Sequence, residues 1–554
     1  MPFPYPIALR GTTKDCLFLS FIMLLSIIHY VHDLGFYCND WTFLGHFSIS
    51  EDQSLPGLIR AFFDVPNNVV MRPVQIIYLS ALYWLFGYHP FGYHLVNAAV
   101  LMSGIMLFYF VLYELNQNRL IALAVPMVYQ LLPHYSTNRF WYAAFQANLS
   151  MTLYFLSLYC DLKMLRTRPT HLWGWKLVSL ASLLGSVLAY EIFFPLFLLN
   201  LPLVWYRLRQ LDSLFLRIRS SKKKLTVILG SNLLALMVVL VFKTLVTTRL
   251  SDYVFINRIK YLIKESLAIN YGSYGFGLPG VLYKILRDYP NGEVFTLGGI
   301  VGLIIFGYLY QVATQPKFEP PRWSDMLKLI GLGLVIFGMG YAIFLTTYVG
   351  FTPTGIENRT AIAAAVGVAF SFVGSLGWIS NFLTSSYLRQ HLFCLLVSLL
   401  CTGGFLINNT IASFWVAAYS QQKEVIADIR QQFPSLPTEN ILMLDGVCPY
   451  IGPGTVFESP WDIEGVLRVI YRDSTLRGDV IRPNLKIKES GIYTVSYGHK
   501  FKYPYQKLFI YNFGTKKTYQ LTDAKVARHY FAKFNPNYSS GCPEGYEGKG
   551  VPVW

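Results

Sequence analysis

Long apolar runs with almost no charged side chains constrain this chain more than any other feature of its sequence. The runs at 16–31, 225–246, 327–348 and 392–407 contain at most one charged residue each. A helix needs about 17–25 mostly apolar residues to cross a hydrocarbon core roughly 30 Å thick. Several of the runs meet that length or fall just short of it. The sequence therefore predicts an all-α polytopic membrane protein.

The charged residues that remain are few and gather in short loops between the apolar runs. Only 14% of the residues are charged, against roughly a quarter in soluble domains. The formal net charge is +16, and Lys and Arg are concentrated most clearly at 161–176 and 207–224. Loops of this kind face the cytoplasm. We therefore attribute the positive charge to membrane topology and expect no nucleic-acid partner.

With the N-terminus inside, the two basic loops indicate an odd number of spans, about eleven. The stretch 73–87 is expected to be an interfacial or re-entrant helix, because a full crossing would place the loop 161–176 outside. The predicted spans are 16–31, 91–115, 120–133, 140–160, 177–188, 193–206, 225–246, 294–309, 327–348, 360–379 and 392–407. This topology gives a membrane module of residues 1–407 with a large first external loop at 32–90.

The polar tail, residues 408–554, is then a separate domain on the external side. Strand-like patterns occur at 441–445, 493–497, 508–513 and 518–521, and a helical pattern occurs at 462–471. About 145 residues suffice for one small α+β domain. Cys448 and Cys542 form a disulfide if this domain is exported, and remain free thiols otherwise. External means the periplasm of a bacterial inner membrane, which we prefer, or the lumen of the endoplasmic reticulum.

Polar residues that the membrane does not require lie in the predicted external loops. They are Asp40, Arg72, Arg139, Glu191, Glu357 and Arg359, which this topology brings to one membrane face. Arginines offer planar donors that suit a phosphate, and a nearby carboxylate can take a proton from a hydroxyl. The pattern fits group transfer from a lipid-linked donor. Transporters also collect such residues at the midplane or the mouth, so a transporter or flippase of a lipid-linked or polar solute is the alternative.

The order of short motifs along residues 16–407 resembles the GT-C superfamily of polyprenyl-phosphate-sugar-dependent glycosyltransferases. Asn39-Asp40-Trp41 in the first loop precedes Arg72-Pro73, and His94-Leu-Val-Asn97 follows. The segments 132–139, 190–195 and 357–362 resemble later motifs of protein O-mannosyltransferases and lipid A aminoarabinose transferases. Members commonly carry two acidic residues in the first-loop motif, whereas this chain has Asn39 before Asp40. That departure weakens the case for a metal held by paired carboxylates.

The resemblance implies inverting transfer of one sugar from a polyprenyl-phosphate donor to an acceptor hydroxyl on the external face. Asp40 would be the catalytic base, and the metal requirement is open, with a divalent ion as the one candidate cofactor. Partners would be the lipid-linked donor, membrane lipids and an acceptor that is a glycan, a lipid or a protein. The residues implied to bind the donor phosphate are Arg72, Arg139 and Arg359, and those implied to support the site are Glu191, Glu357, Asn39, His94 and Asn97.

Each of these residues also has a structural interpretation. Asp40 could cap the helix that follows it, and Arg72 could extend to lipid headgroups from the membrane interface. Arg359 could pair with Glu357, and the polar groups of His94 and Asn97, on one helix face, could bond across helices. The glycine-rich stretch 271–277 is expected to be a turn-rich external loop.

Overall fold

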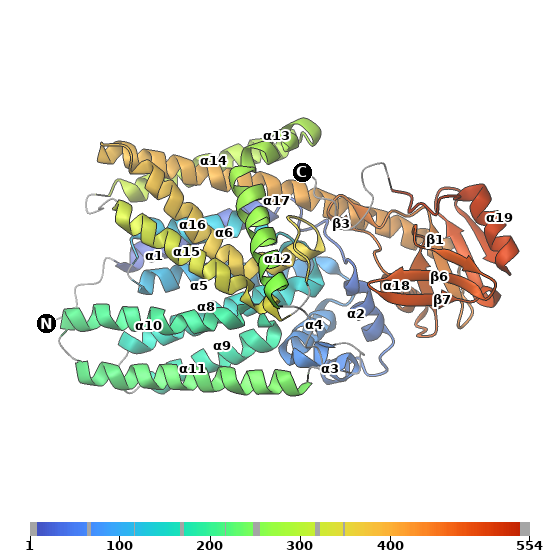
Figure 1. Cartoon of the computed structure of the whole chain (residues 1–554), viewed down its shortest axis with the longest axis horizontal. Helices are drawn as coiled ribbons and strands as arrows, with labels where there is room; N and C mark the ends of the chain where they lie inside the picture. The colour runs from blue at the N-terminus through green and yellow to red at the C-terminus, as the bar shows by residue number, and fades with distance from the viewer. Residues whose placement is uncertain are drawn as a thin grey trace.

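The structure, a computed structural model, describes residues 8–63, 68–115, 117–166, 171–215, 218–246, 255–315, 322–346 and 349–542. A helical bundle occupies one end of the molecule, and a small domain of strands and helices occupies the other (Figure 1). The bundle helices are α1 (Ala8–Ile27), α5 (Pro90–Glu114), α6 (Arg119–Leu131), α8 (Phe145–Arg166), α9 (Leu172–Ala189), α10 (Phe194–Phe215), α11 (Ile218–Val246), α14 (Gly292–Ala313), α15 (Trp323–Ala342), α16 (Ile362–Ser380) and α17 (Ser386–Gln432). The predicted fold class is thereby confirmed.

Eight helical stretches in the described part of the chain are long and apolar enough to cross a membrane. The predicted count of eleven is not confirmed, because α1, α6 and α8 fall outside this set. Helix α6 has 13 residues, or about 20 Å of helix, which is shorter than a hydrocarbon core. Helix α1 contains Arg10, Lys14 and Asp15 in its first turns, and α8 includes polar side chains such as Gln146, Asn148 and Asp161, so both are less apolar than the eight.

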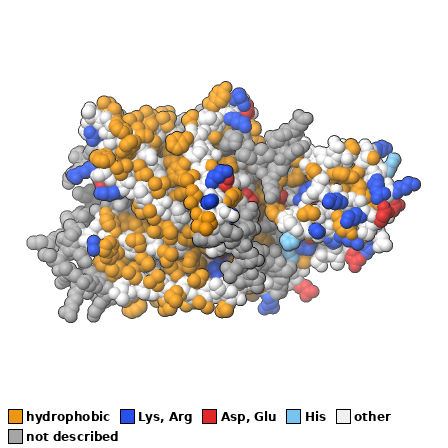
Figure 2. Space-filling view, viewed as in Figure 1, with side chains coloured by type: hydrophobic (Ala, Val, Ile, Leu, Met, Phe, Trp, Pro, Cys, Tyr) orange, Lys and Arg blue, Asp and Glu red, His pale blue; other side chains and the backbone are white. Residues whose placement is uncertain are grey.

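Side chains of different kinds cover the two ends of the molecule. Figure 2 shows hydrophobic side chains over the body of the bundle, whereas Lys, Arg, Asp and Glu gather on the C-terminal domain. Apolar side chains such as Leu17, Met237 and Leu303 are more than 60% exposed on bundle helices. A water-facing surface does not tolerate so large an apolar area, and lipid does. The chain is therefore an integral membrane protein.

Three short helices lie at the end of the bundle that faces the C-terminal domain (Figure 1). They are α2 (Asn39–Ser48), α3 (Leu55–Phe63) and α4 (Pro73–Phe86), all within the predicted first external loop. Pro73 begins α4, where the missing N–H costs nothing. At 14 residues, α4 is about 21 Å long, which fits the expected interfacial helix better than a full crossing.

The stretch 271–277 is helical, so the prediction of a turn-rich loop there was wrong. It belongs to a π-helix, η6 (Ala268–Phe276), between the amphipathic helices α12 (Phe255–Leu267) and α13 (Leu278–Asp288). Tertiary hydrogen bonds outweigh the low helix propensity of its glycines. The Tyr274 hydroxyl donates to the Pro353 carbonyl oxygen at 2.7 Å, and the Asn270 amide donates to the Tyr341 hydroxyl at 2.8 Å.

Helix α17 has 47 residues and is about 70 Å long, so it leaves the membrane and enters the C-terminal domain. It runs through the boundary predicted between residues 407 and 408, and the first strand begins at Ile441. A four-stranded sheet has the order β4-β1-β8-β9, formed by β1 (Ile441–Asp445), β4 (Arg477–Val480), β8 (Leu508–Asn512) and β9 (Lys517–Leu521). Strand β1 is parallel to both β4 and β8, whereas β9 is antiparallel to β8.

A second sheet and two helices complete the domain. The sheet has the order β5-β6-β7, from β5 (Lys486–Lys488), β6 (Gly491–Ser496) and β7 (His499–Tyr503). The helices are α18 (Pro460–Tyr471) and α19 (Ala524–Phe534), and the short pair β2 (Tyr450–Ile451) and β3 (Gly454–Thr455) lies against α17. A disulfide joins Cys448 to Cys542, which is the first of the two alternatives for these cysteines.

Helix α18 packs directly on α2, and this contact joins the domain to the first loop. Gly465 of α18 permits the approach, because a Cβ atom there would lie 2.2 Å from the Trp41 carbonyl oxygen. Gly45 of α2 faces it, with its own Cβ position 2.9 Å from the Gly465 Cα atom. The Thr42 hydroxyl donates to the Trp461 carbonyl oxygen at 3.2 Å. The two helices therefore meet backbone to backbone.

Candidate functional site

Asp40 is fully buried at the start of α2 and fastens the first loop to a later segment. One carboxylate oxygen accepts the N–H of Tyr37 at 2.8 Å, and the other accepts the N–H of Ala143 at 2.8 Å. Burial raises the pKa of this carboxyl well above its usual range, while the backbone N–H bonds act in the opposite direction. The N-cap of α2 is Cys38, and both Asp40 oxygens accept N–H groups that lie outside α2, so the alternative that Asp40 caps its own helix is wrong.

Asn39 turns away from Asp40 and contacts the C-terminal domain. Its side-chain oxygen accepts the indole N–H of Trp461 at 2.7 Å. The chain reverses just before it, at Cys38, which has a positive φ of 48° that is uncommon for a residue other than glycine. The side chain in the place of the family's second acidic residue therefore serves the domain contact.

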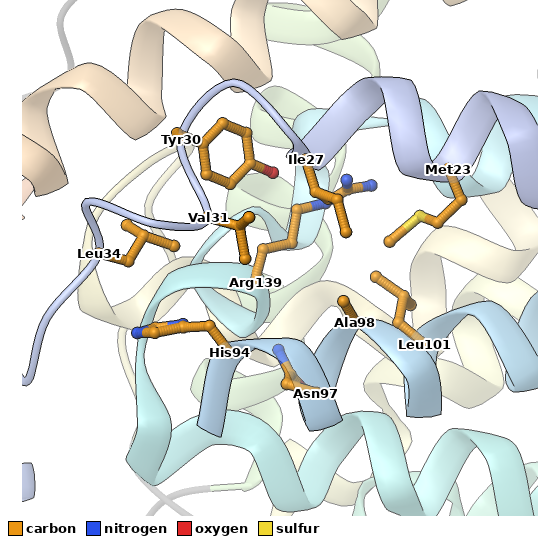
Figure 3. A pocket seen from close by; sticks show the side chains of 10 residues that line it. All are labelled: Met23, Ile27, Tyr30, Val31, Leu34, His94, Asn97, Ala98, Leu101 and Arg139. Atoms are coloured by element: carbon orange, nitrogen blue, oxygen red, sulfur yellow. The ribbon is translucent and has the colours of Figure 1, made fainter. Parts of the chain in front are cut away.

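Arg139 is buried beside a small cavity between α1 and α5 (Figure 3). It lies in the short helix α7 (Thr137–Phe140), donates to the Gln130 carbonyl oxygen and lies 5.9 Å from the centroid of the Tyr135 ring. Its remaining guanidinium nitrogens have no hydrogen-bond partner in the described chain, and no described carboxylate pairs with it. The cavity of about 10 Å³ has room for at most one water molecule.

His94 and Asn97 hold neighbouring segments together around the same cavity. The His94 Nε2 atom lies 2.9 Å from the Gly35 carbonyl oxygen. The Asn97 amide donates to the Asn138 carbonyl oxygen at 3.0 Å and accepts from the Asn148 amide at 2.8 Å. These contacts match the expected bonding across helices.

Arg359 and Glu357 lie in a 3-10 helix, η8 (Ile356–Ala361), that precedes α16. The Arg359 guanidinium lies over the Trp141 ring at 5.0 Å and donates to the Ile356 carbonyl oxygen at 2.5 Å. Glu357 does not pair with it. The Glu357 carboxylate instead fills the space beside Gly350, where a Cβ atom would lie 2.0 Å from its oxygen. The alternative of an Arg359–Glu357 ion pair is therefore wrong.

Arg72 and Glu191 meet in an ion pair that also includes Lys243. The Arg72 Nε atom donates to Glu191 Oε2 at 2.9 Å, and Nη2 contacts Oε1. The Lys243 ammonium donates to Glu191 Oε2 at 3.1 Å and to the Met71 carbonyl oxygen at 3.3 Å. The Arg72 guanidinium also covers the Tyr190 ring at 4.5 Å. Two cations thus flank one carboxylate, and all three side chains are 15–26% exposed.

Lys243 was missed in the sequence, although a signal for it exists. It is the single charged residue in the apolar run 225–246. An ionisable residue in such a run usually faces a partner or a cavity. Its partner Glu191, which interrupts the apolar stretch 177–206, gives the same signal. Pairing the two lone charges of opposite sign would have predicted this contact.

A second acidic group, also missed, lies where the C-terminal domain meets the first loop. Glu458 is nearly buried, with one carboxylate oxygen 4.0 Å from the Cys38 sulfur and the other accepting from the Tyr497 hydroxyl. Asp462 accepts the backbone N–H groups of Glu458 and Ser459 at 2.8 and 3.1 Å. Burial, and then the charge of Glu458, raises the pKa of Asp462 to about 7. The sequence Ser459-x-x-Asp462 at the start of α18 fits a capping box.

The predicted residues thus form two groups. Asp40, His94, Asn97 and Arg359 contact the segment from Pro133 to Phe145, to which Arg139 belongs, whereas Arg72 and Glu191 lie with Lys243. Asn39 contacts the C-terminal domain, and Glu357 lies beside Gly350. The described residues hold no set of three His, Cys, Asp or Glu side chains with metal-ligand geometry. Asp40 has no second acidic ligand beside it in the first-loop motif. These donors do not fit a resident divalent ion, and we derive no step through one.

The fold and these clusters define a class, a polytopic helical membrane protein with two groups of polar residues and a small C-terminal domain of strands and helices. No family model matches the chain, and no curated protein matches it. Solved structures do resemble it. ArnT from Cupriavidus metallidurans bound to undecaprenyl phosphate is 15% identical, with a TM-score of 0.33 over 83% of this chain and 85% of that one. The Archaeoglobus fulgidus oligosaccharyltransferase in the apo form is 12% identical, with a TM-score of 0.41 over 84% and 64%.

Both of these structures belong to the GT-C superfamily that the sequence motifs resemble, but identities of 12–15% and TM-scores below 0.5 do not assign this chain to it. This chain spans just under two thirds of the oligosaccharyltransferase. At TM-scores below 0.5, the likeness carries no argument about substrate or mechanism. The function has to be argued from the residues themselves.

Proposed function

We propose that this protein is a membrane glycosyltransferase that moves a sugar from a polyprenyl-phosphate donor to an acceptor hydroxyl on the external face. The observation that supports it most is the pair of cations, Arg72 and Lys243, held on either side of Glu191. The group carries one net positive charge and is partly exposed. It belongs to the end of the bundle where α4 begins and α11 ends, which is the end nearest the C-terminal domain (Figure 1).

The phosphodiester of a polyprenyl-phosphate sugar, and the phosphate monoester released by transfer, suit such a group. Glu191 takes the Nε and Nη2 donors of Arg72, which leaves Nη1 for a phosphate, and the Lys243 ammonium supplies a point charge. Glu191 fixes both side chains before the ligand arrives, which lowers the entropy lost on binding. When the sugar leaves, negative charge grows on the phosphate oxygens, and cations that are already in place stabilise that charge. Arg139 and Arg359 belong to the other group of residues, and Arg139 is buried beside a cavity too small for a phosphate, so we assign neither to this phosphate.

Asp40 is the proposed base. Each of its oxygens accepts one backbone N–H, and a carboxylate oxygen has two lone-pair positions, so each can still accept from a hydroxyl. A raised pKa makes the ionised form a stronger base near neutral pH. In the transfer, Asp40 takes the acceptor proton while the acceptor oxygen attacks the anomeric carbon opposite the phosphate. The bond from that carbon to the phosphate oxygen breaks, polyprenyl phosphate leaves with the electron pair, and the configuration inverts.

Two features support the external side and the exported domain. The disulfide between Cys448 and Cys542 is typical of oxidising compartments. The basic loops 161–176 and 207–224 belong on the opposite, cytoplasmic face by the positive-inside rule.

The test is transfer from a panel of synthetic polyprenyl-phosphate sugars by purified protein, measured as release of polyprenyl phosphate. We expect Lys243→Gln to lower the rate about 10-fold or more, and Asp40→Asn to lower it about 100-fold or more, because removing a general base typically costs 10²–10⁴. Lys328→Gln removes an exposed cation at the start of α15 and is the matched control. Unchanged release by Asp40→Asn protein with a wild-type unfolding temperature would exclude Asp40 as the base. Absence of release from every donor by wild-type protein would overturn the proposal.

A further inference from the structure

A cavity of about 320 Å³ lies outside the membrane, between the first loop and the C-terminal domain. Its walls come from the first loop (Phe36 and Trp41), the turn before α5 (Tyr88), the outer part of α17 and one face of α18. We call it the α17–α18 cavity. Its volume is at the lower end of the range for small-ligand sites. None of the residues considered above as donor-binding lines it.

The walls are largely aromatic and aliphatic. The Tyr419 ring lies directly against Gly35, where a Cβ atom would be 1.9 Å from the ring, so a side chain at residue 35 would displace this wall. The Phe36 and Trp41 rings meet edge to face, with centroids 5.8 Å apart. Val466, Val469 and Ile470 of α18 complete the apolar part. Such walls suit a ligand with flat faces of C–H groups, as pyranose rings have.

Two cations line the same cavity. Lys423 and Arg430 are seven residues apart on α17, which places them on one helix face about 10 Å apart along the axis. Neither makes an ion pair within the described chain. The nearby acids of α17 are already engaged, because Lys516 contacts Glu424 at 2.9 Å and Asp428 at 2.6 Å. The described lining contains no carboxylate. The cavity therefore has a net positive charge.

Trp41 adds a buried hydrogen-bond donor that lacks an acceptor. Its side chain is 7% exposed, and its indole N–H has no hydrogen-bond partner among the described residues. A buried donor without an acceptor costs about 1–3 kcal/mol, which a ligand oxygen would offset. The cavity thus combines apolar walls with two cations that have no ion-pair partner in the described part of the chain, although the Lys423 ammonium lies 5.0 Å from the centroid of the Tyr419 ring, and one lining residue has an indole N–H without an acceptor there.

We propose that the α17–α18 cavity binds an anionic saccharide, with the apolar faces of the sugar against the aromatic and aliphatic walls and acid groups at Lys423 and Arg430. Neutral sugars match the walls but leave the cations without a partner. Glycerol, serine and ethanolamine headgroups of phospholipids match the cations but have no ring to lie against the aromatic side chains. The proposal does not rest on sugar transfer, because it concerns binding at a place distinct from Arg72 and Lys243.

The experiment is calorimetric titration of the full-length protein with digalacturonate, with maltose as the neutral disaccharide control. We expect digalacturonate to bind, maltose to bind at least 10-fold more weakly, and the affinity for digalacturonate to fall as salt rises. The double variant Lys423→Gln/Arg430→Gln should weaken binding at least 10-fold. Trp41→Phe keeps an aromatic wall but removes the N–H, and should weaken binding by about 3- to 10-fold. Lys500→Gln, which removes an exposed charge on β7, should bind as wild type does.

Three results would overturn the proposal. They are absence of digalacturonate binding to wild-type protein, equal affinity for maltose, and wild-type affinity in the double variant. If phosphatidylglycerol in nanodiscs occupies the cavity and digalacturonate does not displace it, the site binds a lipid. That result would also overturn the proposal. The unfolding temperature of each variant is measured alongside, and Lys423→Gln alone provides a milder test if the double variant is unstable.

Discussion

Replacing Gly465 by alanine should loosen the C-terminal domain from the membrane module. The added Cβ would lie 2.2–2.7 Å from backbone atoms of Trp41 and Thr42, where ordinary contacts begin near 3.4 Å. Backbone cannot rotate away as a side chain does, so α18 and α2 must separate by about 1 Å at this point. Overpacking of this kind typically costs 1–3 kcal/mol. That cost corresponds to a roughly 5- to 150-fold larger population of the detached state.

Cys38 reports this separation. It is 2% exposed, and its sulfur lies 4.0 Å from Glu458 of the C-terminal domain. The assay is labelling of the purified protein with a charged maleimide, followed by peptide mass mapping of Cys38. If labelling occurs from the detached state, Gly465→Ala should raise the rate by the same 5- to 150-fold. Gly45→Ala meets its nearest atom at 2.9 Å and should have a smaller effect.

Gly514→Ala is the matched control, because its Cβ would meet only the Asn512 side chain at 3.6 Å. It should leave the labelling rate unchanged. A wild-type rate in Gly465→Ala would refute the backbone-to-backbone contact between α2 and α18. Fast labelling of Cys38 in the wild type would refute its burial by the domain. Equal acceleration in the Gly514 control would show that the assay senses general loosening instead.

Three further predictions concern charge, covalent and ion-pair contributions. The raised pKa of Asp462 means that its stabilising effect is complete below about pH 4 and is lost as pH rises through about 7, so the wild-type unfolding temperature should fall from pH 5 to pH 8. Asp462→Asn keeps the accepting oxygen and should flatten that dependence; an equally steep fall in the variant would contradict it. Cys448→Ser removes a disulfide that spans 94 residues and should lower the free energy of unfolding of the C-terminal domain by about 4–5 kcal/mol at most. The domain should then unfold at a lower temperature, and an unchanged unfolding temperature would count against the disulfide. Glu191→Gln removes the carboxylate between Arg72 and Lys243 and leaves both cations in place. In competition assays with polyprenyl phosphate, it should weaken donor binding less than Lys243→Gln does. The reverse order would contradict a phosphate site made of two cations.

The sequence predicted the helices well because each apolar run is a local property. The run 225–246 became the membrane part of α11, and the strand predicted at 441–445 coincides with β1. The prediction of a loop at 271–277 was wrong for a physical reason. Its three glycines favour a loop locally, whereas hydrogen bonds from Asn270 and Tyr274 to distant segments hold it as a π-helix. Contacts of that range leave no periodic signal in the sequence.

In the site, too, the sequence predicted which residues matter but not the contacts between residues that are distant along the chain. Residue types pointed to Arg72 and Glu191, but not to their mutual ion pair across 119 residues. The α17–α18 cavity was not predictable either, because its walls are separated by up to several hundred residues along the chain. Trp41 and Val466 come together only because two glycines, Gly45 and Gly465, let their helices touch. In the sequence, a glycine within a helix indicates only a low helix propensity. Its role in close packing can be recognised only when the partner helix is known.

Because α17 is one continuous helix, the α17–α18 cavity is a preformed site. This single helix forms part of the bundle and also one wall of the cavity, so the wall cannot move without the bundle. The Tyr37 hydroxyl donates to the Trp415 carbonyl oxygen at 2.9 Å and ties the first loop to the same helix. The α2–α18 contact fixes the opposite wall. A cavity held on both sides by backbone contacts is preformed, so a ligand that fits it loses little free energy to rearrangement.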